Sequence, residues 1–279
     1  MRVAVLSGKG GAGKTFVAVN LAAVAGTARY VDCDVEEPNG HIFFRPEGCR
    51  DEPVQVTVPV IDHETCDGCR QCVDFCRFNA LAVIGGRMRV FERLCHSCGA
   101  CQVVCPLGAI SETHRVIGRQ RSGRAGKIAF HDGVLAPGEE SGVPIIHRLL
   151  EEANGAGELT VLDCPPGAAC PVMEPVRAAD YCVVVAEPTL FGLHNLRMVL
   201  ELVHLFGKPC GVVVNKATTD DSRIEDFCRA EQIPVLGRIP YDPHLAVLNS
   251  DGRIVADHCP TCAETFRALL SRIIREARA

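Results

Sequence analysis

A chain of 279 residues with a net charge of −5 and 47% hydrophobic residues has the composition of an ordinary globular protein, without the basic excess that would favour nucleic acid as its main partner. No apolar run approaches the length of a membrane span, and Met1-Arg2 leads directly into a β-prone segment, which argues against a transmembrane helix and a secretory signal. Seventeen cysteines, an odd number in a long chain, argue against a secreted disulfide scaffold and indicate metal binding.

The first predicted elements enclose a phosphate-binding loop. Residues 3–7 are a short apolar strand, residues 15–25 are a helix, and the segment between them fits Gly-x-x-x-x-Gly-Lys-Thr. Its backbone N–H groups and the positive helix end are expected to surround a polyphosphate. We expect Lys14 to reach the β- and γ-phosphates of ATP and Thr15 to hold Mg²⁺. The loop comprises Gly8, Lys9, Gly10, Gly11, Ala12, Gly13, Lys14 and Thr15.

Acidic residues follow two of the predicted strands. Residues 29–34 are predicted as a strand ending in Asp32 and Asp34, and residues 159–163 as an apolar strand ending in Asp163. Because the carboxyl ends of parallel strands meet at one edge of a sheet, these acids should face the phosphate loop. Asp163 has the Walker B position and is expected to bind Mg²⁺ through water. Asp34 can position a water for attack on the γ-phosphate; the alternative is a solvated acid at a strand end.

Two runs of cysteines share the spacing Cys-x2-Cys-x2-Cys-x3-Cys, with 18 residues between them. In bacterial ferredoxins of this spacing, the fourth cysteine of each run ligates the other run's cluster. Zinc sites also use Cys-x2-Cys, but not duplicated four-cysteine runs. Arg77 follows the first run where Pro106 follows the second, which is expected to alter the potential or exposure of one cluster rather than its ligation. We therefore predict two [4Fe–4S] clusters, one held by Cys66, Cys69, Cys72 and Cys105, the other by Cys95, Cys98, Cys101 and Cys76.

The order of the remaining elements predicts an α/β fold with a doubly wound, mainly parallel sheet and a small inserted α+β domain. The insert occupies residues 60–114, between residues 1–59 and 115–279 of the nucleotide domain. The connector after it is either a coupling element or a spacer. Further predictions are strands at 54–60, 181–186, 210–215 and 233–239, hairpins at 80–91 and within 118–133, and helices at 141–153, 190–206 and 263–279.

The loop, with its second lysine at Lys9, resembles the deviant Walker A loop of the MinD/ParA/Mrp superfamily of P-loop ATPases, here with an inserted bacterial-type 2[4Fe–4S] ferredoxin domain. The resemblance implies ATP hydrolysis and an ATP-dependent dimer in which Lys9 crosses to the partner's nucleotide. It also implies that Asp34 orients the hydrolytic water. Gly167 of Asp-x-Pro-Pro-Gly would sense the γ-phosphate, and Asn215 would contact adenine.

The combination implies a cytoplasmic iron–sulfur ATPase that couples a dimer switch to electron transfer or to maturation of an iron–sulfur or metal centre. Its partners would be a second copy or a similar ATPase and a redox or metal-centre protein. The alternative is a positioning ATPase, like MinD or ParA, with the clusters as a redox sensor; a plain ferredoxin carrier is a third reading, against which the intact nucleotide motifs count. The apolar stripe of the last helix favours a closing core helix over membrane binding.

One further pair of cysteines has a motif spacing, Cys259-Pro-Thr-Cys262. Mrp-type scaffold ATPases bridge a cluster between two subunits with Cys-Pro-x-Cys, but at a different place in the chain. Binding of a labile metal or cluster by this pair therefore stays open beside a role without metal. Cys182 and Cys210 lie in apolar strands and are expected to be buried, inert thiols.

Overall fold

The chain forms a large mixed sheet. The computed structural model describes residues 1–153, 158–218 and 222–278, and within them the main sheet has nine strands. Neighbouring strands from β11 to β7 are parallel, and the last two strands are antiparallel to their neighbours. In sheet order the strands are β11 (Val235–Pro240), β10 (Cys210–Ala217), β9 (Tyr181–Ala186), β1 (Arg2–Leu6), β8 (Leu159–Asp163), β2 (Ala28–Asp32), β7 (Ile128–Leu135), β6 (Ile110–Ala125) and β3 (Glu47–Ile61).

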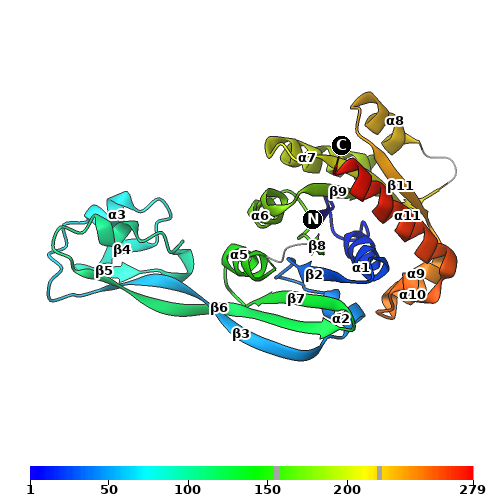
Figure 1. Ribbon diagram of the computed structural model, residues 1–279. Helices are drawn as coiled ribbons and strands as arrows, with labels where there is room; N and C mark the ends of the chain where they lie inside the picture. The colour runs from blue at the N-terminus through cyan, green and yellow to red at the C-terminus, as the bar shows by residue number, and fades with distance from the viewer. Residues whose placement is uncertain (154–157, 219–221, 279) are drawn as a thin grey trace.

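Helices cover both faces of the sheet (Figure 1). Because strand side chains alternate, Ala4 and Leu6 belong to the core on one face and Val3 and Val5 to the core on the other. The first core is closed by α5 to α8 and the second by α1, α2 and α11. The helices of this main body are α1 (Lys14–Val24), α2 (Gly40–Phe44), α5 (Val143–Glu152), α6 (Cys170–Ala178), α7 (Leu190–Leu205), α8 (Arg223–Ala230), α9 (Pro243–Ser250), α10 (Val255–His258) and α11 (Pro260–Glu276).

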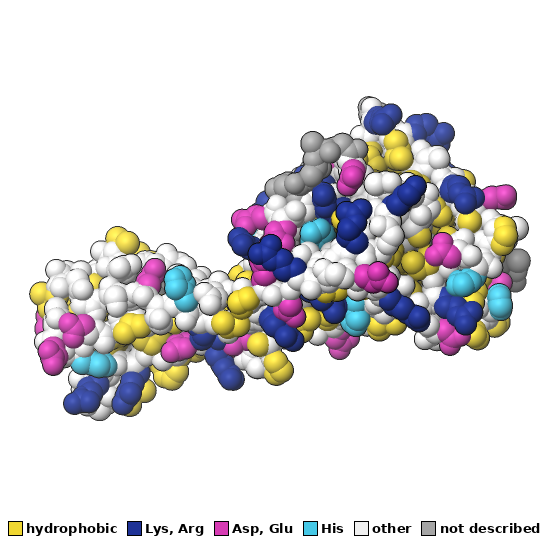
Figure 2. Space-filling view, turned by 60° about the horizontal axis from the view of Figure 1, so that its bottom comes forward, with side chains coloured by type: hydrophobic (Ala, Val, Ile, Leu, Met, Phe, Trp, Pro, Cys, Tyr) yellow, Lys and Arg dark blue, Asp and Glu magenta, His cyan; other side chains and the backbone are white. Residues whose placement is uncertain are grey.

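Strands β3 and β6 continue past the sheet as a two-stranded ribbon that carries a small lobe, drawn at the left of Figure 1. The lobe contains the hairpin of β4 (Leu81–Ile84) and β5 (Arg87–Val90), the helices α3 (Gln71–Phe75) and α4 (Ala100–Val103), and the 3-10 helix η1 (Glu92–Leu94). Its small core consists of Cys72, Leu81, Met88 and Ile110. Figure 2 shows the ribbon as a narrow neck between the lobe and the main body.

The predicted α/β class with a large, mainly parallel sheet is confirmed, as is the hairpin at residues 80–91. The strand predicted at 54–60 is only the middle of β3, because its pairing with β6 continues into polar sequence on the way to Glu47. Helices α2, α6, α8, α9 and α10 were not predicted. Each is nine residues long or shorter, and α6 carries Pro171 at its start and Pro175 inside, where proline argues against a helix.

The predicted C-terminal helix packs as a core helix. It begins at Pro260 rather than at residue 263, because the Cys259 sulfur accepts the Cys262 N–H and caps the first turn. Phe266, Leu269 and Ile273 of its apolar stripe are buried against the sheet and α1. The predicted end, residue 279, lies outside the described residues. Over the described ranges, every helix is too short or too polar to cross a membrane.

The aromatic cluster beneath α2 gives a test of the second core. Phe130 is completely buried and lies 5.8 Å from the ring of Tyr30 and 6.0 Å from that of Phe44, measured between centroids. Phe130→Ala leaves a cavity and should lower the free energy of unfolding by about 3–5 kcal/mol in urea denaturation. Leu205→Ala, at a side chain 75% exposed, is the control and should change it by less than about 0.5 kcal/mol. Equal effects would place Phe130 outside the core.

Candidate functional site

The phosphate loop joins β1 to α1 and needs glycine at two close approaches. Gly13 has φ 94°, and a Cβ there would lie 2.0 Å from the Asn215 amide nitrogen. A Cβ on Gly8 would lie 2.5 Å from the Asn195 carbonyl oxygen. Asn215, at the end of β10, also donates from its side-chain nitrogen to the Ala12 carbonyl at 2.9 Å. The loop is therefore held against β10 and α7 by contacts that only glycine permits.

Lys14 lies inside a buried acidic cluster. Its ammonium is 2.6 Å from an Asp163 oxygen, and the other Asp163 oxygen accepts the Tyr30 hydroxyl at 2.8 Å. Burial alone lowers the pKa of Lys14, but Asp163, Asp32 and Asp34 outweigh burial and raise that pKa above its ordinary value. Lys14 is therefore charged, and Asp163 is positioned from two sides where β1 and β8 run in register.

Asp32 and Asp34 have different surroundings. Asp32 is 1% exposed and accepts backbone N–H groups of residues 34, 39 and 40, so it fastens the chain between β2 and α2. Burial raises the pKa of Asp32 to about 8, and Asp163 adds to this. Asp34 is half-buried, lies 4.0 Å from the Lys14 ammonium and lines a cavity of about 260 Å³ with Pro165 and Pro166. Burial raises the pKa of Asp34 to about 6. Of the two acids, Asp34 is the one that a water can reach.

Lys9 is paired within its own chain. Its ammonium lies 2.6 Å from Glu187 and 5.6 Å from the centre of the Phe191 ring. Glu187 also contacts Lys216 at 2.6 Å, and Lys216 donates to the Gly11 carbonyl at 2.8 Å. Burial would raise the pKa of Glu187, but the two lysines lower it below its ordinary range. Glu187 thus holds Lys9 and Lys216 together beside the loop, in an arrangement that the sequence did not predict.

Glu187 could have been found by the reasoning that identified Asp163, because it directly follows the apolar strand β9 at the same edge of the sheet.

Gly167 has φ 94°, and its N–H donates to the Ser7 carbonyl at 2.8 Å. The structure thus brings Gly167 to the loop, with its N–H engaged by the backbone.

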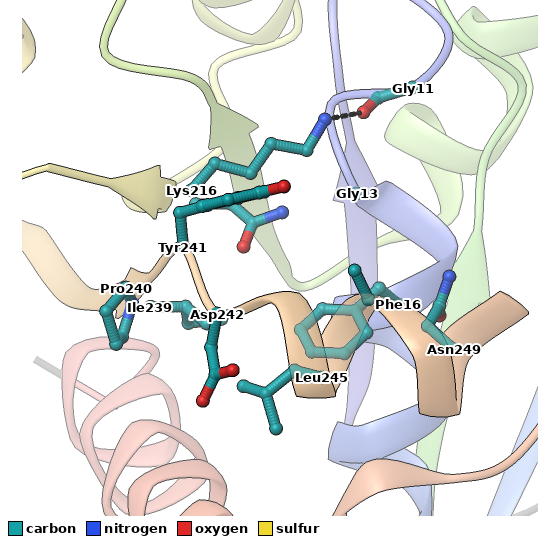
Figure 3. Close-up of a pocket in the computed structure, with 12 residues that line it drawn as sticks. Gly11, Gly13, Phe16, Lys216, Ile239, Pro240, Tyr241, Asp242, Leu245 and Asn249 are labelled. Carbon is teal, nitrogen blue, oxygen red and sulfur yellow. Dashed lines mark hydrogen bonds between the residues drawn. The ribbon is translucent and has the colours of Figure 1, made fainter.

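A cavity of about 210 Å³ opens beside the loop (Figure 3). Lys216 and Tyr241 lie on one side of it and Phe16 and Leu245 on the other. Asn215, predicted to contact adenine, lines it too. Phe16 and Leu245 supply apolar surface and Lys216 a cation, which suits a planar aromatic group attached to an anion. The residues after β11 were missed in the sequence because only the folded chain brings them to the loop.

The eight cysteines of the two runs lie in the small lobe and line two separate cavities. One cavity is bordered by the four cysteines Cys66, Cys69, Cys72 and Cys105, and the other by Cys76, Cys95, Cys98 and Cys101. Within residues 1–153, 158–218 and 222–278, no group of three or more His, Cys, Asp or Glu side chains is close enough to hold a single metal ion. A four-iron cubane is bulkier than one ion and spaces its thiolates farther apart than a single-ion site does.

The backbones of the two cysteine runs repeat each other. Counted from the first cysteine of each run, left-handed residues fall at the same places: Gly68 and Ser97, Arg70 and Gly99, Asn79 and Gly108. The fourth cysteine of each run accepts a backbone N–H four residues later, from Ala80 to Cys76 at 3.4 Å and from Ala109 to Cys105 at 3.3 Å. The fourth cysteines of the two runs therefore have the same backbone surroundings, with an N–H group directed at each sulfur.

The comparisons with known proteins agree with this fold. An uncharacterized protein of Methanocaldococcus jannaschii is 26% identical over 277 residues, which cover 98% of this chain and 96% of the relative. Hydrogenase-4 component A of Escherichia coli is 32% identical over 123 residues, 41% of this chain and 56% of that protein. Among solved structures, cell division ATPase MinD of Pyrococcus furiosus has a TM-score of 0.60 at 16% identity and covers 98% of both chains.

MinD of Pyrococcus horikoshii, complexed with Mg-ADP, has a TM-score of 0.58 at 17% identity and covers 96% of this chain and 93% of that one. These likenesses establish the fold. The sequence profile of the CobQ/CobB/MinD/ParA nucleotide binding domain matches residues 3–255, which is most of the chain. The chain therefore belongs to the CobQ/CobB/MinD/ParA nucleotide-binding family and is an ATPase.

Proposed function

We propose that this ATPase carries two [4Fe–4S] clusters in its small lobe and couples nucleotide binding to electron transfer or to maturation of a metal centre. The observation that carries the proposal is the sorting of eight cysteines into two cavities, each with three ligands from one run and one from the other. The domains are then residues 60–114 for the cluster module and residues 1–59 and 115–279 for the ATPase.

The residues of the lobe fit such clusters. The repeated left-handed positions and the N–H groups directed at Cys76 and Cys105 suit thiolates that bind iron. The local similarity to a hydrogenase component also supports an electron-transfer role for part of the chain. When bound, each cluster would carry one electron at a time. The protein would set the potential by burial and by these N–H groups.

On the ATPase side, we assign the polyphosphate to Gly8–Thr15, Mg²⁺ to Thr15 and Asp163, and the base to the cavity beside Asn215. Asp34 would position the attacking water, since it is the acid open to the site and lies near Lys14. Gly167 would sense the γ-phosphate only after its N–H leaves Ser7. If ATP closed the site in this way, the segment that contains Asp34 and the segment that contains Gly167 would both change position.

Lys9 would act in a dimer with a second copy or with a similar ATPase. The contact with Glu187 keeps the Lys9 ammonium on the subunit to which Lys9 belongs. Reaching a partner's nucleotide would require Lys9 to leave Glu187, while Lys216 remains to neutralise that carboxylate. Leu190 and Phe191, 73% and 62% exposed beside Lys9, offer apolar surface for such an interface.

Contacts and one short segment of chain join the nucleotide site to the lobe. The carbonyl of Val35, the residue after Asp34, accepts the Leu135 N–H at 2.8 Å, at the end of β7. The Val35 side chain packs closely on Gly142, where an added Cβ would lie 2.3 Å from it. Four residues beyond Leu135, Glu139 pairs with Arg115 of β6.

Arg115 completes the path into the lobe. Its Nε lies 3.8 Å from the Glu92 carboxylate, and its Nη2 donates to the Glu92 carbonyl at 3.4 Å. Glu92 lies three residues before Cys95, a proposed cluster ligand. Movement of Asp34 with nucleotide would thus be transmitted to the surroundings of one cluster.

The second candidate, a positioning ATPase with a redox-sensing module, is favoured by the similarity to MinD over 98% of the chain. It would require ATP-dependent binding to liposomes or DNA. Sedimentation of the protein with either, with and without an ATP analogue, distinguishes the two functions, because electron transfer requires no such surface.

Asp34→Asn tests the assignment of the water-positioning group. The variant should bind a fluorescent ATP analogue normally but release phosphate about a hundredfold more slowly or worse, since its amide cannot accept the water's proton. Glu36→Gln, an exposed acid two residues on, is the control and should hydrolyse ATP at the parental rate. Unchanged hydrolysis by Asp34→Asn would contradict the assignment.

Iron content tests the clusters. Anaerobically purified protein should contain about eight iron and eight acid-labile sulfide per chain, and the double variant Cys69→Ser/Cys72→Ser about four of each. Cys49→Ser removes an exposed cysteine outside both runs and should keep about eight. Protein with intact ATPase activity but little iron would refute the cluster proposal and leave the family assignment standing.

Arg115→Ala tests the coupling. In the parental protein, an ATP analogue should change the potentials found by reductive titration. In Arg115→Ala, iron content and ATP hydrolysis should persist while this nucleotide effect is lost. Arg119→Ala, four residues along the same strand at an exposed arginine, should retain it. The coupling is refuted if potentials ignore nucleotide in the parental protein or if Arg115→Ala responds as the parent does.

A further inference from the structure

The Cys-Pro-Thr-Cys segment at the start of α11 lies outside both the nucleotide site and the cysteine runs. The sulfurs of Cys259 and Cys262 are joined in a disulfide. Cys259 is the N-cap of α11, and its sulfur accepts the Cys262 N–H at 3.2 Å and lies 3.3 Å from the Thr261 hydroxyl. We propose that Cys259 and Cys262 form a redox-active dithiol–disulfide pair that exchanges with small-molecule disulfides and thiols.

The disulfide is better suited to chemistry than to stability. A bond between residues three apart closes so small a loop that it removes little entropy from the unfolded chain. Both cysteines are partly exposed, and Pro260 and Thr261 between them are exposed, so a small reagent can reach the sulfurs. Reachable disulfides are the ones that exchange readily.

The position of Cys259 makes its sulfur the expected nucleophile. Helix α11 has 17 residues, and its N-terminus places partial positive charge next to the N-cap. The Cys262 N–H already points at the Cys259 sulfur. Both features stabilise the negative sulfur that attacks in thiol–disulfide exchange, as in Cys-x-x-Cys oxidoreductase motifs.

The surrounding packing keeps the two thiols adjacent after reduction. Before the pair, the Ala256 N–H donates to the buried Asn20 side chain of α1 at 2.8 Å. After it, the Phe266 ring packs against Phe16 with centroids 5.7 Å apart. Because both ends of the segment are fixed to α1, the disulfide can form again without a search of the chain.

Most other cysteines outside the runs are unsuited to this chemistry. Burial raises the pKa of Cys182 and of Cys228 to about 12 and that of Cys33 well above its usual range, so these stay thiols. In the described part of the chain, Cys49 and Cys170 are exposed but form no disulfide. The proposed activity is therefore confined to one pair.

The exchange balances in two steps. The Cys259 thiolate attacks one sulfur of a small disulfide and forms a mixed disulfide with it. The S–S bond of the small molecule breaks, and one small thiolate leaves. Cys262 then loses its proton and attacks the Cys259 sulfur, which releases the second small thiolate. The protein pair loses two electrons and two protons, and the small disulfide gains them as two thiols.

The test reads this pair alone. Anaerobic holoprotein is equilibrated in glutathione buffers of increasing oxidised fraction, quenched in acid, alkylated and digested with trypsin. The peptide of residues 254–267 contains Cys259 and Cys262 and no other cysteine. The expected result is a single transition from the doubly alkylated to the unalkylated peptide, with no stable singly alkylated form. Cys262→Ser should accumulate glutathione on Cys259, whereas Cys259→Ser should accumulate much less on Cys262.

Two results would overturn the proposal. One is a doubly alkylated peptide in every buffer, which would show that the pair does not oxidise. The other is iron or zinc in the parental protein in excess of that in Cys259→Ser/Cys262→Ser, which would make the pair a metal site. Neither result depends on the clusters of the small lobe.

Discussion

The buried contact between Lys14 and Asp163 is the interaction on which the nucleotide site depends. It exists because β1 and β8 are parallel neighbours, so that Asp163 at the end of β8 lies beside Lys14 at the start of α1, the helix after β1. A buried ion pair gains little net stability, since desolvation offsets attraction. Tyr30 and Asp32 complete the cluster, and with them the sheet positions the group that would hold Mg²⁺ before any nucleotide arrives.

The same edge of the sheet gives neighbouring acids separate tasks. The Asp32 carboxylate accepts backbone N–H groups and fixes the start of α2. Asp34 lies at the opening of the site. The Val35 carbonyl accepts the Leu135 N–H at the end of β7, and β7 pairs with β6 of the ribbon, so the proposed displacement of Asp34 would reach the ribbon. The lobe is attached through this ribbon, so distance alone does not isolate the cysteines from the nucleotide.

Features that depend on short spacing were predictable from the sequence, and features that depend on tertiary neighbours were not. The phosphate loop follows from residues a few positions apart and Asp163 from a strand end. The placement of each run's fourth cysteine beside the other run follows from the ferredoxin spacing. Three contacts were not predicted because they join separate segments of the chain: Glu187 with Lys9, Tyr30 with Asp163, and Arg115 with Glu92. The full length of β3 was missed because its first half is polar and is held as a strand by pairing with β6.

Hydrogen–deuterium exchange of the holoprotein, with and without a non-hydrolysable ATP analogue and Mg²⁺, tests most directly whether the nucleotide site and the lobe act as one device. If the two act as one device, exchange should change at the phosphate loop and also at β6, at residues 135–142 and at η1, along the contacts through Val35 and Arg115. Altered exchange confined to the loop, β8 and the cavity beside Asn215 would contradict the coupling, because nucleotide binding would then end at the site itself.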